Sequence, residues 1–289
     1  DNLLDKNYVL EVNKAFDNGS KIITSYRNSK NFNTNWVSAT TGMAFLRECR
    51  FIHTPRALLN TSTFVSGTGF TVSSQILNVD TGWKYTTLTE DIEFSTNNIA
   101  CGEKVTYCDD AIFYDEQPTT FKASWNQRMR WQKGFYQCFV GYFWALFAAL
   151  FTRNSFASYE MIIMIFPFSA ITVFWNIIYI IYGAFYTFTS KIAPGAPVPI
   201  LTILAGLLST IAIFYALLFA YGMLILISER KRVKTTFWQK IKHSLMFPVF
   251  MFSYLPISIV ALFKKVKWKQ IPHTDSRNIE DIESQNVNN

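Results

Sequence analysis

Two long segments with almost no charge constrain this chain more than any other feature of its sequence. Tyr159–Phe188 and Val198–Ser228 each hold about 30 residues, enough for a tilted helix to cross about 30 Å of hydrocarbon. Hydrophobic residues make up 50% of the chain and aromatic residues 17%, which is too apolar for an ordinary soluble domain. The sequence therefore predicts a polar domain over residues 1–133, an α-helical membrane region over 134–269 and a polar tail over 270–289.

The basic residues lie beside the apolar segments and predict an orientation in the membrane. Glu229–His243 and Lys264–Lys269 are strongly basic, whereas Thr189–Pro199 carries only Lys191. The positive-inside rule places both basic stretches in the cytoplasm and Thr189–Pro199 outside. Two crossings then put residues 1–133 in the cytoplasm, as part of a multi-pass protein of the cell membrane. The net charge of +7 is interpreted as attraction to anionic lipid headgroups, and nucleic acid is not expected as a partner.

Two shorter apolar segments are not expected to cross. Phe135–Phe151 is predicted to lie at the membrane interface. Ser244–Phe263 has basic residues at both ends and contains Pro248 and Pro256, so it is predicted to be re-entrant or interfacial. Two extra crossings in compensating places would give the same orientation.

The sequence before residue 134 predicts alternating helices and strands, which is typical of an α/β domain. Thr89 is a good helix N-cap, and Glu90 and Asp91 suit the positive end of the helix dipole. We predict helices at 8–17, 36–49, 89–101 and 119–134, strands at 21–25, 83–88, 105–108 and 111–114, and a glycine turn between two β-prone runs in 64–74.

Three short motifs precede the membrane region in a fixed order. They are Gly67-Thr68-Gly69, Thr89-Glu90-Asp91 and Gln127-x-x-Arg130-Trp131. Each has a purely structural explanation: a hairpin turn, a capped helix start and an Arg/Trp anchor at a membrane interface, respectively. Their order, followed by membrane segments with consistent charge, is more specific than any one of them.

In this order the motifs resemble those of the processive family 2 glycosyltransferases, such as cellulose, hyaluronan and poly-N-acetylglucosamine synthases. The TED and QxxRW motifs are signatures of that family, and an interfacial helix and membrane spans follow QxxRW in its members. The resemblance runs from Asp1 to about His273. It implies a GT-A-like catalytic domain, of which residues 1–133 are the carboxy-terminal part, and transfer from a UDP-sugar to a glycan or glycolipid acceptor.

The resemblance assigns catalysis to the second motif. Inverting glycosyl transfer needs a base to take the proton of the attacking hydroxyl, and such proton transfer typically contributes about 10²–10⁴-fold. By resemblance that base is Asp91, with Glu90 beside it in the substrate site. Gly67, Thr68 and Gly69 are expected to line the acceptor site, because glycine lets the backbone approach a ligand closely.

The third motif and the first residue complete the predicted site. Gln127 and Arg130 match positions that the family places near the donor diphosphate, where an arginine stabilises negative charge. Trp131 matches the aromatic residue on which the acceptor sugar stacks. Asp1 matches the last residue of an Asp-x-Asp site and would be a ligand of Mg²⁺ or Mn²⁺; the alternative is a surface aspartate. On this interpretation the donor-binding half precedes Asp1, and catalysis by the chain alone stays open.

Several functions remain open at this point. We expect a hexosyl- or N-acetylhexosaminyltransferase that extends a polysaccharide, and UDP-N-acetylglucosamine and UDP-glucose are the favoured donors. A non-processive transferase acting on a lipid acceptor is the nearest alternative, although QxxRW favours processivity. A transporter is disfavoured because the membrane segments contain almost no ionisable residue. An inactive relative that only binds is a third possibility.

Overall fold

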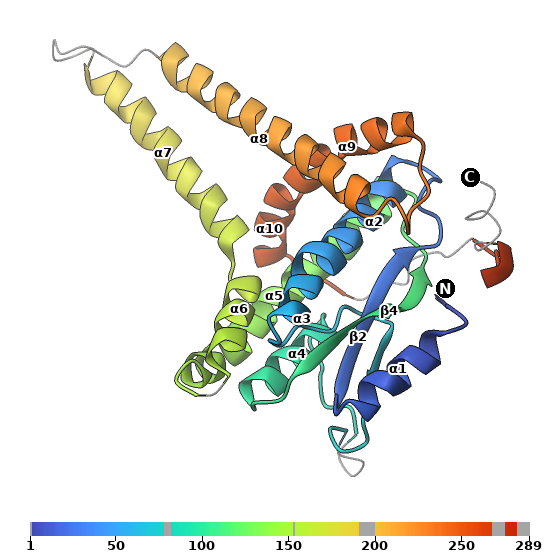
Figure 1. Ribbon diagram of the computed structural model, residues 1–289. Coiled ribbons are helices and arrows are strands. Elements are labelled where there is room, and N and C mark those ends of the chain that lie inside the picture. The colour runs from blue at the N-terminus through green and yellow to red at the C-terminus, as the bar shows by residue number, and fades with distance from the viewer. Residues whose placement is uncertain (1, 78–81, 153, 191–199, 268–274, 282–289) are drawn as a thin grey trace.

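A four-stranded mixed sheet forms the centre of the amino-terminal domain in the computed structural model, which describes residues 2–77, 82–152, 154–190, 200–267 and 275–281 (Figure 1). The strand order is β1-β4-β2-β3; β2 and β4 are parallel, and the two outer pairs are antiparallel. The strands are β1 (Leu3–Leu4), β2 (Ile22–Ser29), β3 (Phe70–Val72) and β4 (Val105–Asp115).

A bulge interrupts the pairing of the two central strands. Ser25 pairs with Cys108, whereas the next residue, Tyr26, pairs with Ile112. The extra residues of β4 therefore bend the strand without ending it. This explains why the two strands predicted at 105–108 and 111–114 form one strand.

Helices cover both faces of the sheet. Ile23 faces α1 (Tyr8–Asp17), where it packs in a cluster with Tyr8 and Phe113. Ile22 points to the opposite face, because side chains alternate along a strand, and packs there with Phe94 of α4 (Glu90–Ala100). On the same face, α2 (Trp36–Glu48) continues through a π-helical turn (Cys49–His53) into α3 (Thr54–Leu58). The predicted α/β fold is confirmed, as are the helices at 8–17 and 36–49 and the strand at 21–25.

The strand predicted at 83–88 is wrong. This segment is not part of the sheet, and the backbone N–H groups of Thr86 and Thr87 donate to the side chain of Glu93 at 2.9 and 2.8 Å. A carboxylate on α4 therefore satisfies donors that a neighbouring strand would otherwise satisfy.

One long helix replaces two predicted segments. α5 (Phe121–Ala149) contains the helix predicted at 119–134 and most of the separate interfacial segment Phe135–Phe151. Thr120 caps its start by accepting a hydrogen bond from the N–H of Ala123. The later half exposes Val140 and Trp144, so it keeps the apolar surface that an interfacial position requires.

The first predicted span is divided at a proline. Tyr159–Phe188 falls on α6 (Ser155–Ile165) and α7 (Phe168–Ser190), which are separated by Phe166 and Pro167. Phe166 has an extended backbone (ψ 137°), since the ring of a following proline disfavours helical geometry. The crossing candidate therefore begins after the proline.

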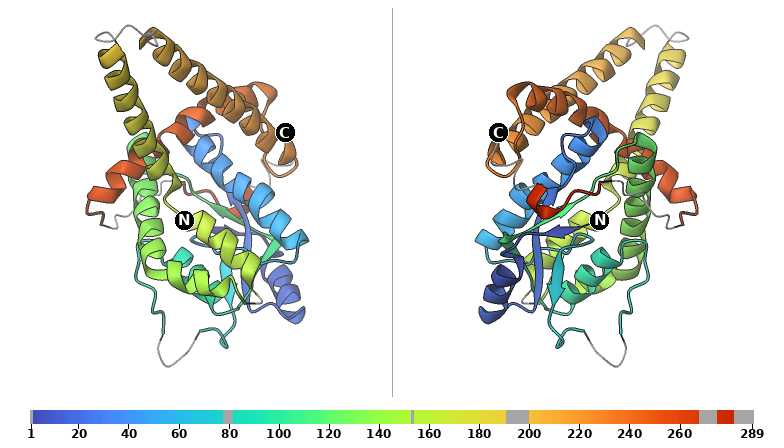
Figure 2. Two further views of the ribbon diagram at one scale, coloured as in Figure 1. Left: turned by 90° about the vertical axis from the view of Figure 1, so that its left-hand side faces the viewer. Right: turned by 90° about the vertical axis from the view of Figure 1, so that its right-hand side faces the viewer.

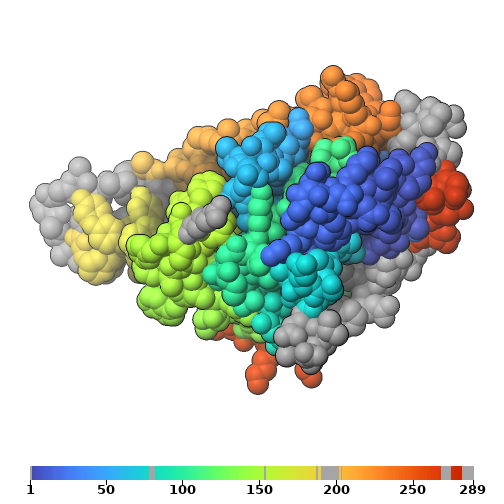
Figure 3. All heavy atoms as spheres, turned by 60° about the horizontal axis from the view of Figure 1, so that its bottom comes forward, coloured from blue at the N-terminus to red at the C-terminus, as the bar shows by residue number. Residues whose placement is uncertain are grey.

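Three stretches of the described residues are long and apolar enough to cross a membrane: Phe168–Tyr186, Leu204–Ser228 and Phe237–Phe263. The second lies in α8 (Ile200–Ser228), and the third combines α9 (Phe237–Phe252) with α10 (Tyr254–Phe263). α7 and α8 project away from the domain (Figures 1 and 2), and in a space-filling view α7 (yellow) protrudes at one edge (Figure 3). These projecting apolar surfaces suit contact with lipid.

The end of α8 is fastened to the sheet. Buried Glu229 accepts a hydrogen bond of 2.7 Å from the hydroxyl of Tyr26 on β2. Arg232 pairs with both carboxylate oxygens of Asp109 in the β4 bulge, at 3.0 and 2.6 Å, and its guanidinium lies 4.1 Å from the Tyr26 ring centroid. A bidentate pair fixes orientation as well as distance, so the apolar hairpin is joined rigidly to the two central strands.

Candidate active site

The structure brings the first two predicted motifs together. The loop at Gly67 lies over the first turn of α4, and a Cβ placed on Gly67 would lie 3.9 Å from the Oδ2 atom of Asp91. The backbone N–H of Gly67 donates a hydrogen bond to the Asp91 carboxylate. The glycine loop therefore contacts the predicted base directly.

The environment of Asp91 changes its acidity. Burial raises the pKa of this carboxyl to about 6, and the negative charge of Glu90 acts in the same direction. Hydrogen bonds from the N–H groups of Ile92 and Gly67 lower the pKa and partly offset the effect. Asp91 is thus ionised near neutral pH while holding a proton more strongly than an ordinary aspartate, which suits a general base.

The loop before Asp91 requires its glycines. Gly67 and Gly69 have φ angles of +76° and +63°, which side chains rarely adopt. A Cβ on Gly69 would lie only 2.6 Å from Cζ of Phe113. Between them, Thr68 accepts a hydrogen bond of 3.1 Å from the side-chain amide of Asn2. The loop is therefore held against both β4 and the start of the chain.

Helix α5 packs directly on the start of α4. A Cβ on Gly134 would lie 2.6 Å from Cγ2 and 2.8 Å from Cβ of Thr89. Arg130 donates to the carbonyl of Leu88 at 2.9 Å, and Gln137 accepts from the N–H of Leu88 at 3.0 Å. The third motif therefore lies on the helix that positions the segment immediately before Asp91.

Gln127 and Trp131 lie on the same helix with different surroundings. Trp131 contacts Phe45 edge to face, with 5.7 Å between ring centroids. The Oε1 atom of Gln127 is buried and accepts no hydrogen bond from the described residues. A buried acceptor without a donor is a position where a ligand donor is favourable.

An arginine that the motifs did not predict links these parts. Arg27, near the end of β2, lies 3.6 Å from the centroid of the Phe45 ring and forms a buried ion pair with Asp115. Its Nη1 atom donates to the carbonyl of Ser66 at 3.0 Å and would lie 3.6 Å from a Cβ on Gly67. A single arginine in an otherwise uncharged strand, IITSYRNS, is the sequence signal that could have identified it.

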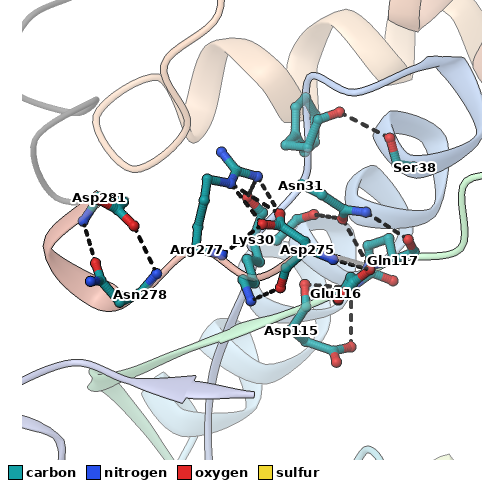
Figure 4. A network of polar contacts seen from close by, with 12 residues as sticks. Lys30, Asn31, Ser38, Asp115, Glu116, Gln117, Asp275, Arg277, Asn278 and Asp281 are labelled. Atoms are coloured by element: carbon teal, nitrogen blue, oxygen red, sulfur yellow. Dashed lines mark hydrogen bonds and ion pairs between the residues drawn. The ribbon is translucent and has the colours of Figure 1, made fainter. Parts of the chain in front are cut away.

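The carboxyl ends of β2 and β4 carry a polar network (Figure 4). Lys30 donates its N–H to the carbonyl of Asp115, and the N–H of Asp275 donates to the side chain of Glu116 at 3.2 Å. Arg277 donates to the carbonyl of Lys30 at 2.8 Å. Part of the predicted polar tail therefore packs at the edge of the sheet where α/β proteins usually bind ligands.

The predicted metal site is not assembled from the described residues. Asp1 lies outside them, and within them no group of three or more His, Cys, Asp or Glu side chains could hold a metal ion. Asp115 is already neutralised by Arg27. The described residues alone therefore provide no divalent-cation site, and Mg²⁺ or Mn²⁺ stays a prediction.

Two comparisons relate the chain to known proteins. The sequence profile of the family described as "Glycosyl transferase family group 2" matches residues 1–228. The "Probable glycosyltransferase YdaM" of Bacillus subtilis (strain 168) is 31% identical over 70 residues, which are 24% of this chain and 17% of that protein. The chain thus spans a small part of the length of this curated relative.

Proposed function

Because the chain belongs to the family group 2 glycosyltransferases, we propose that it transfers hexosyl or N-acetylhexosaminyl units from a UDP-sugar to a growing glycan at a membrane. The observation that carries this proposal is the placement of Asp91. Its carboxyl has a pKa of about 6, lies under the glycine loop, and follows the segment held by α5. The glycine loop therefore contacts the proposed base, and Arg130 of the QxxRW motif contacts the segment that precedes it.

In the proposed reaction Asp91 takes the proton of the acceptor hydroxyl. The hydroxyl oxygen forms a bond to the anomeric carbon from the face opposite the leaving group, and the bond from that carbon to the nucleoside diphosphate breaks. The electron pair leaves with the diphosphate, so the configuration inverts. Arg130 uses one nitrogen for Leu88, and its other N–H groups have no hydrogen-bond partner in the described part of the chain. With Gln127 they would contact the developing charge of the diphosphate.

The contacts of α8 support two crossings with a cytoplasmic catalytic domain. Glu229, just after α8, contacts the same domain that leads into α6 and α7, so both ends of the α7–α8 hairpin lie on one side. The basic stretch beginning there favours the cytoplasm. A helical hairpin that enters the membrane from the catalytic side and returns to that side suits a synthase that makes its product at the inner membrane surface.

The third apolar stretch, Phe237–Phe263, is proposed to enter and return on the catalytic side. Before it, the carbonyl of Lys234 accepts a hydrogen bond from Asn33; at its end, that of Leu262 accepts one from Lys133. Within the most apolar 18 residues of this stretch, 39% are buried by the protein, against 6% for Phe168–Tyr186. The protein itself therefore covers much of the third stretch. Length and composition permit a crossing, but both ends lie against the domain.

A donor panel tests the function. Membranes containing the natural protein are incubated with labelled UDP-sugars and Mg²⁺ or Mn²⁺, and product size is measured. We expect one sugar to enter high-molecular-weight material. Label that appears only in a small lipid product would replace the polysaccharide proposal with single addition to a lipid acceptor. No transfer from any UDP-sugar would contradict the proposed donor class.

The pH profile tests the base. Since Asp91 acts only when ionised, kcat/KM is expected to rise about tenfold per pH unit below about pH 6 and to level off above it. Glu90→Gln removes a charge that raises the pKa of Asp91, so the rising limb should move to lower pH. A profile that is flat between about pH 4.5 and about pH 8 in both proteins would exclude Asp91 as the base.

A further inference from the structure

A basic cavity of about 600 Å³ lies where α8 ends and α9 begins. Four of its lining residues are cations, Arg230, Lys231, Lys234 and Lys240, and none is acidic. The connection between two apolar helices therefore concentrates positive charge around a space large enough for a phosphate group and its substituents.

These cations are not neutralised by the described part of the protein. None of the four forms an ion pair there. Asp109 and Glu229 line a second cavity with Arg230 and Lys231. Asp109 is paired with Arg232, and buried Glu229 accepts a hydrogen bond from Tyr26 and lies 3.8 Å from Arg50. Because like charges gathered around one cavity repel each other, the arrangement favours an anion.

Thr235 lines the cavity and carries a hydroxyl without a partner among the described residues. The Oγ1 atom of Thr235 is buried and makes no hydrogen bond to the described residues. The neighbouring Thr236 and Gln239 are already used, because they form a capping box at the start of α9. Rotation of the Thr235 side chain would turn the hydroxyl toward the cavity, where a phosphate oxygen would accept from it and from lysine together, which is a stronger match than charge alone.

Exposed aromatic residues place this cavity at a membrane surface. Phe237 and Trp238, in the first turn of α9, are 64% and 76% exposed. Large aromatic side chains beside lysine and arginine are typical of the boundary between headgroups and acyl chains. Basic pockets next to membrane helices on the cytoplasmic side bind anionic lipid headgroups.

We infer that this cavity binds the phosphate of an anionic phospholipid, which holds the α8–α9 connection at the membrane surface. The cations supply charge and the Thr235 hydroxyl supplies a directed donor. Phe237 and Trp238 extend beside the acyl chains. This site goes beyond the proposed sugar transfer and needs no nucleotide sugar.

Thermal unfolding of the purified full chain in a neutral detergent tests the site without any sugar nucleotide. Short-chain phosphatidylglycerol is titrated, beside phosphatidylcholine of equal chain length and inorganic phosphate. We expect phosphatidylglycerol to raise the midpoint temperature at concentrations where the other two do not. Stabilisation by inorganic phosphate at equal concentration would identify a free-anion site, and equal stabilisation by phosphatidylcholine would identify a general lipid effect; either overturns the inference.

Two variants and a matched control locate the binding. Lys234→Gln with Lys240→Gln is expected to weaken phosphatidylglycerol binding by about 30-fold, from about fivefold per cation. Lys264→Gln with Lys265→Gln removes the same charge after α10 and should leave binding unchanged. Thr235→Val, which keeps shape and charge, should weaken binding about tenfold through the lost hydrogen bond. Equal weakening by both lysine pairs, or no effect of Thr235→Val, would overturn the inference that this cavity binds the lipid phosphate.

Discussion

Asp91→Asn is expected to lower sugar transfer by about 10²–10⁴-fold, because asparagine keeps the shape of the side chain but cannot accept the acceptor proton. Transfer of label from the preferred UDP-sugar measures this. Asp110→Asn is the matched control, since Asp110 is exposed on β4 and lies outside the candidate site. An Asp91→Asn protein as active as the parent would remove Asp91 from the mechanism.

The same substitution is expected to stabilise the fold at pH 8. The pKa of Asp91 is raised in the folded protein to about 6, above its ordinary 3.8, so the folded chain binds the proton more tightly than the unfolded chain. Stability therefore falls as pH rises from about 4 to about 6, and the penalty persists above that window. Asparagine carries no such penalty. A higher midpoint temperature at pH 8, with a smaller difference at about pH 4.5, where folded Asp91 is mostly protonated, is the expected signature of a residue kept for function.

Gly134→Ala is expected to reduce transfer by about 100-fold while the chain still folds. A methyl group at this position overlaps Thr89, so α5 must move away from the segment that leads into Asp91. Displacement of catalytic groups by about 1 Å typically costs about 10²-fold in rate. Activity with the preferred UDP-sugar measures the loss, and thermal unfolding shows whether the fold is retained.

Two further variants separate a local overlap from a general effect on α5. Gly141→Ala adds a methyl group to the same helix where no atom lies within 4 Å, so it should be neutral or stabilising. Thr89→Gly removes the overlapping atoms at a helix N-cap that tolerates glycine, so it should restore activity to Gly134→Ala. If the double variant is no better than Gly134→Ala alone, the contact with Thr89 is not the cause.

Local signals in the sequence predicted the elements that local rules govern. The helix at 8–17 ends at Asn18-Gly19 as expected, and the glycine loop and Asp91 meet. Pro167 is itself a local signal for the break between α6 and α7, but the uninterrupted apolar sequence around it concealed this break. Apolar composition does not distinguish one long helix from two helices joined at a proline.

The partners of buried charges could not be predicted, because they depend on contacts between distant parts of the chain. Arg27 pairs with Asp115, and Arg128 donates to the carbonyl of Phe250 at 2.9 Å and stacks on its ring. Arg128 lies within the QxxRW motif but points to α9 rather than to the candidate site. The motif does not show which arginine faces which neighbour, because that depends on the packing of α9 against α5.

The fastening of α8 has a consequence for how the protein meets bilayers of different thickness. α8 has 29 residues and is about 44 Å long, which exceeds a hydrocarbon core of about 30 Å. The segment just after its last turn is fixed to the sheet through Tyr26 and Asp109, so mismatch cannot be relieved there by sliding or rotation. α7 meets α6 at the extended Phe166-Pro167 joint. We expect a thinner or thicker bilayer to change the tilt of α7 about that joint. Because the end of α8 is fixed to β2 and β4, a shift of the membrane surface along α8 would change the distance between that surface and these strands.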